Sequence, residues 1–368
     1  MARILILTAH SGGGHVSLAH ALRERLSPAD EVLIVDPLPR AVHLHYRLVS
    51  RHALWLWAAE FRRTNTRERA LAMHRAIDAL FGWRLRAILR RQRPDLVIAT
   101  AGVLTYAARH AQRRVGSAAP FVTLFADGER LHATWLTVRD VDATLAPTHE
   151  TYAEARAAGF PPERLHLVGW PVRAQFLRGG PDRTVALARL GLDPGRLTAF
   201  VQGGAEGTAG IVRTVESVLA AGAAQVILAA GTNRRLRDRF AGAARVRAVP
   251  FTEEIAPLMA AADVVLGKAG PNMLFEAVTL GKPFVATTHI PGQEEGNLAL
   301  IERYGLGWVA LEPCDQRALI VQLAAGPAVL AARRASVERY RVWNTAATQS
   351  IGPLLRQLAA AREAVEAA

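Results

Sequence analysis

The sequence predicts an α/β protein made of two doubly wound, Rossmann-like domains that face each other across a cleft. Short runs rich in β-branched residues and Leu alternate with helical segments along most of the 368 residues, a pattern typical of parallel sheets. The pattern starts twice with an apolar run that ends in a glycine loop, at Ala2–Thr8 and at Leu197–Gln202. A chain of this length exceeds one ordinary domain, so we expect each half to bury its own core.

The first domain is expected to cover residues 1–172. Its opening strand, glycine loop, helix and second strand form a βαβ unit. The predicted strands are Ala2–Thr8, Glu31–Val35, Asp95–Thr100, Pro120–Phe125, Val141–Leu145 and Leu165–Val168. The predicted helices are Ser17–Leu26, Ala41–Phe61, Arg75–Gln92, Tyr106–Arg114 and Thr151–Ala158.

The second domain is expected over residues 173–345, followed by a helical tail, 346–368, that packs back on the first domain. The predicted strands are Leu197–Gln202, Gln225–Ala229, Val246–Val249, Ala262–Gly267 and Pro283–Thr287. The predicted helices are Thr184–Leu190, Ile211–Ala221, Arg234–Phe240, Glu253–Ala261 and a segment from Met273 to Gly281. Parallel sheets bind ligands at the carboxyl ends of their strands, so the site is expected in the cleft between the domains.

Composition excludes several classes of protein. The chain is 51% hydrophobic, which indicates a globular protein. Its single cysteine, Cys314, excludes an intrachain disulfide and a cysteine metal cluster. The N-terminus lacks a signal-peptide pattern, and no apolar run is long enough to span a membrane. We therefore expect the protein in the cytosol or on the cytoplasmic face of the membrane.

The positive charge is concentrated in one segment. The formal net charge is +13, and residues 40–93 hold thirteen Arg and three acidic residues, 13 − 3 = +10. This indicates an anionic partner, and lipid headgroups are favoured over nucleic acid because no nucleic-acid-binding motif is present. Residues expected at the membrane are Arg47, Arg51, Trp55 and Trp57. The alternatives are a helix packed with its Trp side chains in the core, and a general preference for Arg, since the chain has only two Lys.

Two residues of the first domain are candidates for proton transfer. His15 ends the Gly12-Gly13-Gly14 loop, where Gly14 lets the backbone approach a donor phosphate closely. His15 is suited to binding that phosphate or to taking a proton from an acceptor hydroxyl, and the alternative is a capping or core histidine. Asp127 ends a strand, with His132 and Trp135 following as candidate acceptor contacts. The alternative for Asp127 is a turn.

The second domain carries the expected donor site. The loop from Lys268 offers backbone N–H groups at a helix start, which suits a phosphate. No metal is expected, because helix N-termini and cations would neutralise a diphosphate. The candidate donor-binding residues from loops and cations are Arg173, Gly203, Gly204, Glu206 and Lys268. A plain turn at Gly203–Gly207 is the alternative.

Together these segments resemble the monogalactosyldiacylglycerol synthase family, which includes bacterial diacylglycerol glucosyltransferases. The resemblance covers nearly the whole chain and rests on GGGH, DGERLHATW from Asp127, GWPVR ending at Arg173, GGAEG, and KAGPN spaced before PGQEEGN. It implies the GT-B fold and metal-independent, inverting transfer of a sugar from a UDP-sugar to a lipid hydroxyl, by a peripheral membrane protein.

The resemblance also implies roles for single residues. His15 would lie near the diphosphate and the acceptor, and Asp127 would be the base or its partner. Arg173 would contact the donor, and Glu276 would bind its ribose. The uracil would be held by the backbone from Val249 to Phe251. The diphosphate would be bound by Gly270, Pro271, Asn272 and Met273. The sugar hydroxyls would be bound by Gln293 and Glu294.

Three positions depart from the family pattern, and the third of them bears on which acceptor is used. Ala205 replaces a usual glycine, Asn272 replaces another, and Ala101-Gly102 stands where His-Pro is common. The expected product is a glycolipid from diacylglycerol and either glucose or galactose. The alternatives are transfer to another lipid or small molecule (a polyprenol, a carotenoid or a secondary metabolite), a UDP-sugar epimerase, and a non-catalytic nucleotide sensor at a membrane.

Overall fold

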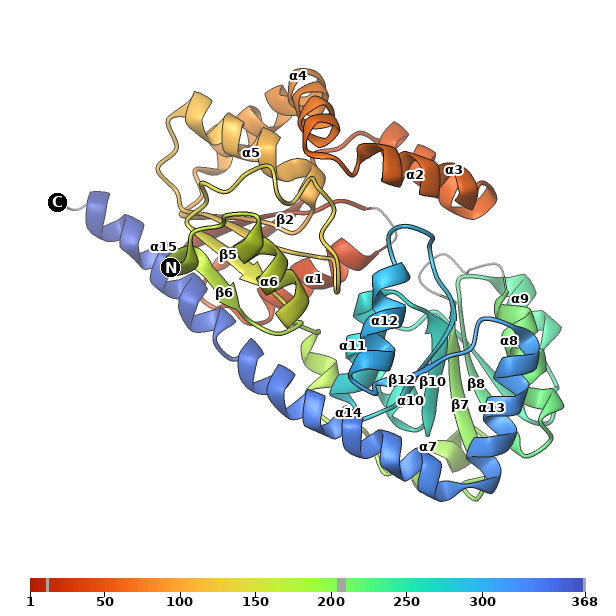
Figure 1. The fold of residues 1–368 in the computed structure, drawn as a ribbon. Helices are drawn as coiled ribbons and strands as arrows, with labels where there is room; N and C mark the ends of the chain where they lie inside the picture. The colour runs from red at the N-terminus through yellow and green to blue at the C-terminus, as the bar shows by residue number, and fades with distance from the viewer. Residues whose placement is uncertain (11–12, 204–209, 367–368) are drawn as a thin grey trace. The chain divides into compact units, whose positions relative to one another are not determined.

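The computed structural model describes residues 1–10, 13–203 and 210–366, which form two compact units (Figure 1). Unit 1 comprises Met1–Arg173, Pro291–Gln293 and Asn344–Ala368. Unit 2 comprises Ala174–Ile290 and Glu294–Trp343. Each unit holds a six-stranded sheet in which all strand pairs are parallel. The predicted α/β class with two doubly wound halves is confirmed.

The sheet of unit 1 has the strand order β2-β1-β3-β4-β5-β6. Its strands are β1 (Arg3–Leu7), β2 (Glu31–Val35), β3 (Leu96–Ala99), β4 (Phe121–Leu124), β5 (Ala143–Ala146) and β6 (Leu165–Leu167). Ile4 of β1 is paired with Val32 on one side and Leu96 on the other, and its side chain is fully buried. Because the order reverses between β1 and β3, the loops after these two strands diverge and leave room for a ligand.

Helices cover the sheet of unit 1. They are α1 (Gly14–Arg23), α2 (Arg40–His52), α3 (Leu54–Thr64), α4 (Arg67–Gln92), α5 (Gly102–Val115), α6 (His149–Ala157) and α15 (Ile351–Glu366), with the short η1 (Pro162–Arg164) before β6. The single helix predicted over Ala41–Phe61 is wrong. Ala53, at φ −143° and ψ 56°, ends α2 and starts α3. No Gly or Pro marks this break, so local sequence gave no sign of it.

The sheet of unit 2 has the order β12-β11-β10-β7-β8-β9. Its strands are β7 (Leu197–Gln202), β8 (Ala224–Gly231), β9 (Val246–Pro250), β10 (Val264–Lys268), β11 (Phe284–Thr288) and β12 (Gly307–Val309). In chain order within the unit this is the 3-2-1-4-5-6 arrangement of nucleotide-binding sheets, and it reverses between β7 and β10. Leu266 of β10 is paired with Val201 of β7 at that point.

The helices of unit 2 are α7 (Arg183–Arg189), α8 (Ile211–Ala220), α9 (Arg234–Arg239), α10 (Ala256–Ala260), α11 (Pro271–Thr279), α12 (Glu295–Arg303) and α13 (Pro313–Ala325), with η2 (Ala174–Phe176) at its start. A further helix, α14 (Pro327–Thr348), begins in this unit and ends in unit 1. The predicted elements did not include α12, β12 or α13. Of these, α13 joins the apolar core of unit 2, since its Ile320 and Leu323 pack with Val215 and Val218 of α8.

The C-terminal residues of the chain are held by polar contacts within unit 1. Asn344 receives a hydrogen bond from the backbone N–H of Trp170 (2.6 Å) and donates one to its carbonyl (3.1 Å). Gly169 must be glycine here, because its φ is +71° and a Cβ would lie 2.8 Å from the Asn344 carbonyl oxygen. Across the described residues, no single helix has the length and apolar composition to cross a membrane.

Candidate functional site

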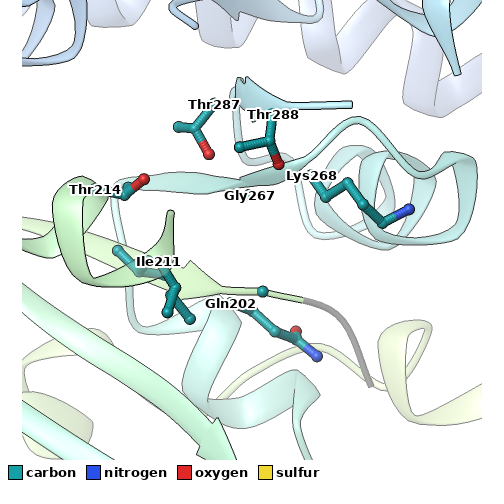
Figure 2. Close-up of a pocket in the computed structure, with 9 residues that line it drawn as sticks. Gln202, Ile211, Thr214, Gly267, Lys268, Thr287 and Thr288 are labelled. Carbon is teal, nitrogen blue, oxygen red and sulfur yellow. The ribbon is translucent and has the colours of Figure 1, made fainter. Parts of the chain in front are cut away.

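A small pocket lies at the carboxyl ends of β7, β10 and β11, where the sheet order of unit 2 reverses (Figure 2). Its lining is Val201, Gln202, Gly203, Ile211, Thr214, Gly267, Lys268, Thr287 and Thr288. Gly267 keeps β10 close to its neighbours, since a Cβ there would be 2.6 Å from the Gln202 carbonyl oxygen. The pocket therefore lies where an open parallel sheet binds a nucleotide.

Two threonines at the end of β11 belong to this pocket, and sequence reasoning missed them. The Thr288 hydroxyl is buried and has no hydrogen-bond partner among the described residues. A buried hydroxyl without a partner is costly unless a ligand or water completes it. The signal that was available is the polar pair Thr287-Thr288 at the end of an apolar strand.

Lys268 is the last residue of β10, and its ammonium is paired with the Glu294 carboxylate. The second oxygen of Glu294 accepts a hydrogen bond from the Ile290 N–H (2.9 Å), and the side chain is 5% exposed. Gly270 stands against the pair, because a Cβ there would lie 3.2 Å from Lys268 Nζ. In this structure both groups satisfy each other, and their predicted roles toward diphosphate and sugar stay predictions.

The loop before α11 is fixed by its own backbone. Ala269 donates its N–H to the Thr288 carbonyl (2.8 Å), and Asn297 donates its amide to the Ala269 carbonyl (2.8 Å). α11 then begins at Pro271, which lacks an N–H but has the φ of a first helical residue. Met273 and Glu276 lie on this helix and are nearly buried. The helix N-terminus and its positive dipole end therefore lie beside the Lys268–Glu294 pair.

The other predicted donor residues are distributed more widely. Gly203 lines the pocket, whereas Gly204 and Glu206 lie outside the described residues. Val249 is in β9, and Phe251 follows it with 65% of its side chain exposed. Pro271 and Asn272 open α11. Gly14 opens α1, and Arg173 and Gln293 belong by their contacts to unit 1.

His15 lies at the reversal point of the unit 1 sheet. It is the second residue of α1, after β1, and its Nδ1 is 2.7 Å from the carbonyl oxygen of Thr100, after β3. A carbonyl only accepts, so Nδ1 carries the hydrogen and Nε2 keeps its lone pair in the neutral ring. Burial lowers the pKa of His15, partly opposed by the Thr100 hydrogen bond. The ring is thus held as a neutral proton acceptor.

Asp127 lies after β4 and organises the loop that follows. It accepts hydrogen bonds from the His132 N–H (3.0 Å) and from the Trp135 side chain. Burial raises the pKa of Asp127 to about 6, and the same hydrogen bonds oppose this rise. The carboxyl group therefore titrates near neutrality, but it is also tied to a structural loop.

Trp135 was predicted to contact the acceptor, which stays a prediction, and in the structure its side chain belongs to a buried apolar cluster. Its side chain is 3% exposed, and its ring packs edge-on against Phe125 at 5.6 Å between centroids. A Cβ on Gly102 would lie 2.8 Å from the same ring. The Trp135 ring thus fills the space beside Gly102, which gives a physical reason for a glycine in place of a larger residue there.

His132 connects α3 with the loop after Asp127. Its Nδ1 is 3.0 Å from the Thr134 hydroxyl, and its Nε2 lies 3.3 Å from both the Phe61 carbonyl and the Thr64 hydroxyl. Burial lowers the pKa of His132 to about 4. A nearly buried, neutral imidazole with both nitrogens engaged supports the position of α3, and its predicted contact with the acceptor stays a prediction.

Large apolar side chains are exposed on α2, α3 and α4. We call the docking surface the set Val42, Leu44, Leu48, Leu54, Trp55, Leu80 and Trp83, which are 38–74% exposed. Trp55 is the most exposed of these at 74%. Trp57 is half-buried instead and packs edge-on against Tyr46 at 5.0 Å. The side chains of Arg47 and Arg51 lie outside the described part, although their backbones are in α2.

Two family models match the chain, one in each half. Residues 28–172 match "Monogalactosyldiacylglycerol (MGDG) synthase", and residues 198–322 match "Glycosyltransferase family 28 C-terminal domain". The chain is a family 28 glycosyltransferase of the monogalactosyldiacylglycerol synthase type. The family predicted from KAGPN, PGQEEGN and the glycine loops is confirmed, as is the prediction of a glycosyltransferase.

Curated relatives resemble this family 28 enzyme at modest identity. Monogalactosyldiacylglycerol synthase of Spinacia oleracea is 25% identical over 333 residues, which cover 83% of this chain and 63% of that protein. Monogalactosyldiacylglycerol synthase 3 of Arabidopsis thaliana is 25% identical over 345 residues, covering 86% of this chain and 73% of that protein. Both are described as chloroplastic.

Solved structures share its fold. MurG of Acinetobacter baumannii matches with a TM-score of 0.62 and 14% identity, over 97% of this chain and 100% of that one. The calicheamicin glycosyltransferase CalG4 matches with a TM-score of 0.60 and 17% identity, over 100% and 98%. These matches confirm the GT-B fold of this glycosyltransferase.

Proposed function

We propose that this UDP-sugar-dependent glycosyltransferase moves a hexose, glucose or galactose, from its donor to diacylglycerol at a membrane surface and so makes a glycolipid. The observation that carries the proposal is the match of the N-terminal half to the synthase model and of the C-terminal half to the family 28 model. The synthase names of the curated relatives support the lipid acceptor.

The donor is proposed to bind unit 2 without a metal ion. The diphosphate would meet the N-terminus of α11 around Gly270–Met273, where N–H groups and the helix dipole favour negative charge. Lys268 would supply a cation once the anionic donor competes with Glu294 for it. Glu276 would bind the ribose, and the backbone from Val249 to Phe251 would hold the uracil. Gln293, Glu294 and Arg173 are proposed as further contacts to the sugar and the diphosphate.

The proton of the acceptor hydroxyl is proposed to move to His15 Nε2. As the proton leaves, the hydroxyl oxygen attacks the anomeric carbon from the face opposite to UDP. The bond from that carbon to the diphosphate oxygen breaks, and its electron pair leaves with UDP. His15 suits this step because the Thr100 carbonyl fixes its tautomer and burial keeps the ring neutral. Asp127 is the alternative base, with a pKa of about 6.

The docking surface supports a peripheral position at the cytoplasmic face of the membrane. It combines exposed Leu and Trp side chains with an Arg-rich segment, 40–93, whose net charge is 13 − 3 = +10. Apolar side chains enter the lipid interface, and each basic residue near an anionic surface adds about 1 kcal/mol of attraction. A UDP-sugar epimerase needs no such surface. The docking surface therefore favours a lipid acceptor over the epimerase alternative.

The test is a product assay with purified protein. Anionic vesicles that contain diacylglycerol are incubated with UDP-glucose, UDP-galactose and UDP-N-acetylglucosamine in turn, and lipids and nucleotides are analysed by mass spectrometry. The expected result is a hexosyl-diacylglycerol with one equivalent of UDP released. Transfer only to a polyprenol or another aglycone overturns the diacylglycerol acceptor, and an isomerised UDP-sugar without UDP release overturns transfer itself.

A further inference from the structure

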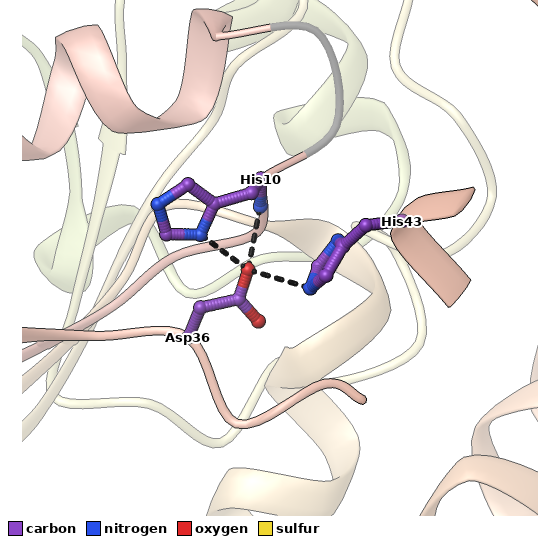
Figure 3. Close-up of side chains that lie close together, drawn as sticks. All are labelled: His10, Asp36 and His43. Atoms are coloured by element: carbon purple, nitrogen blue, oxygen red, sulfur yellow. Dashed lines mark hydrogen bonds and ion pairs between the residues drawn. The ribbon is translucent and has the colours of Figure 1, made fainter. Parts of the chain in front are cut away.

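We propose that His10, Asp36 and His43 of unit 1 form a binding site for a divalent transition-metal ion, with Zn²⁺ as its best match. The three residues come from three elements that meet at the carboxyl edge of the sheet (Figure 3). His10 follows β1, Asp36 directly follows β2, and His43 lies in the first turn of α2. The site uses none of the residues proposed for the transfer reaction, although the charge of Asp36 acts on His15 and partly opposes the lowering of its pKa by burial.

The ligand atoms already converge. Asp36 Oδ2 lies 2.7 Å from His10 Nδ1 and 3.2 Å from His43 Nε2. The three atoms all lie within 4.8 Å of one another. In a tetrahedral zinc site with bonds of about 2.1 Å, neighbouring ligand atoms are about 3.4 Å apart. The His43 distance needs almost no change, and His10, whose side chain is 61% exposed, has room to move outward.

The carboxylate is held in place without the imidazoles. The His10 backbone N–H donates to Asp36 Oδ2 (2.6 Å), and the Leu38 N–H donates to Oδ1 (2.9 Å). The Asp36 side chain is only 7% exposed. Hydrogen bonds that orient a ligating carboxylate from behind are a regular part of metal sites. Asp36 is thus a fixed ligand, to which two histidines are brought.

Hydrogen bonds alone do not account well for the number of nitrogen atoms close to Asp36 Oδ2. If both imidazoles presented N–H groups, Asp36 Oδ2 would accept three donors, two from rings and one from the His10 backbone. One carboxylate oxygen has about two lone-pair directions. A metal ion removes the conflict, because it binds the lone pairs of deprotonated ring nitrogens and of the oxygen together.

The choice of partners also points to a metal. The chain contains 45 Lys and Arg residues, yet the ion pairs seen for Asp36 in the described residues are with two histidines. The other histidine–carboxylate pairs described, His45–Glu60 and His110–Asp78, contain one imidazole each. Two imidazoles and one carboxylate are a zinc ligand set, with the remaining positions left to water.

The bound ion would fasten the start of α2 to the ends of β1 and β2. Because α2 carries part of the docking surface, the ion would stiffen the base of that surface. Its role is therefore structural, and no step of sugar transfer runs through it.

The test measures metal binding directly on untagged, full-length protein stripped with a chelator. Zn²⁺ is titrated in competition with a chromophoric chelator, and Co²⁺ is added separately because its visible absorption reports coordination by nitrogen and oxygen. One equivalent of Zn²⁺ is expected to bind and to raise the melting temperature by mass action. His43→Gln, which keeps a hydrogen-bond donor, should weaken binding at least about tenfold.

His45→Gln is the matched control, since His45 is on the same helix, 57% exposed, and paired with Glu60 instead. Circular dichroism checks that both variants fold. His10→Gln is made in parallel, so that one misfolded variant does not decide the result. The proposal is overturned if the wild type binds no Zn²⁺ at 100-fold excess over protein, or if His43→Gln and His10→Gln bind as the control does. Transfer activity is not a readout, so failure here is distinct from failure of the proposed reaction.

Discussion

The two sheets of this glycosyltransferase share a design but carry different chemistry at the carboxyl ends of their strands. In unit 2 the edge presents a helix N-terminus, threonine hydroxyls and a Lys268–Glu294 pair. In unit 1 the edge presents two buried titratable groups, His15, whose pKa is lowered by burial, and Asp127, whose pKa is raised by burial to about 6. One edge is suited to holding a fixed charge, and the other to moving a proton.

This difference has a physical basis in burial. Backbone N–H groups do not titrate at any ordinary pH, so their attraction for a diphosphate does not change with pH. Burial disfavours the charged form of a titratable group, so it keeps a buried imidazole neutral and raises the pKa of a buried carboxylate toward neutrality. If this difference holds, substitutions at the unit 2 edge should affect donor binding, and substitutions at the unit 1 edge should affect proton transfer.

The largest effect is expected from His15→Ala. Loss of the proton acceptor should lower kcat about 10²–10⁴-fold, while the KM for the UDP-sugar changes little. Steady-state kinetics on diacylglycerol vesicles measures both constants. His20→Ala, one turn further along α1, is the control and should keep near-normal turnover. Equal losses in both variants would mean that α1 as a whole, and not the His15 ring, supports catalysis.

The two tryptophans Trp135 and Trp55 should respond in opposite ways. Trp135→Ala empties a buried site and should lower the free energy of unfolding by about 3–5 kcal/mol. Trp55→Ala removes a 74% exposed ring and should change stability by less than about 0.5 kcal/mol, but weaken vesicle flotation. Chemical denaturation and flotation measure the two effects. Unchanged flotation of Trp55→Ala would exclude it from the docking surface.

A smaller effect is expected for Lys268→Met at the unit 2 edge. Loss of the cation should raise the KM for the UDP-sugar about tenfold, since a charged hydrogen bond contributes about 1.5–3 kcal/mol, and leave the pH profile unaltered. Lys282→Met is the matched control, because Lys282 is the other lysine of the chain and burial lowers its pKa to about 8. A raised KM in the control alone would contradict the assignment of the pocket.

The smallest effect concerns the pH dependence of kcat/KM. Burial lowers the pKa of His15, so its proton-free form should persist below the ordinary value of 6.5. The acid limb of the kcat/KM profile should therefore lie below pH 6.5. The same shift means that His15 opposes folding as the pH falls through 6.5, because the unfolded chain binds a proton first. In Asp127→Asn the limb should move by less than about one pH unit if His15 is the base. Loss of the limb would assign the proton to Asp127.

Much of the fold could be predicted because it rests on local patterns. Apolar runs marked most of the strands, and Leu197–Gln202 was predicted with the bounds that β7 has in the structure. The break at Ala53 could not be predicted, because no Gly or Pro stands there and tertiary packing decides between one helix and two. α12, β12 and α13 were not among the predicted elements.

The sequence by itself determined the fold class, the family and the glycine loops, because these depend on residues close together in the chain. The tertiary structure decided which of two similar tryptophans is buried, since Trp135 fits against Gly102 while Trp55 is 74% exposed. It also brought together His10, Asp36 and His43, whose spacing matches no sequence motif. The physical reason is the same in both cases: burial and ligand geometry depend on neighbours that are distant in sequence, and only the packed sheet edge places them side by side.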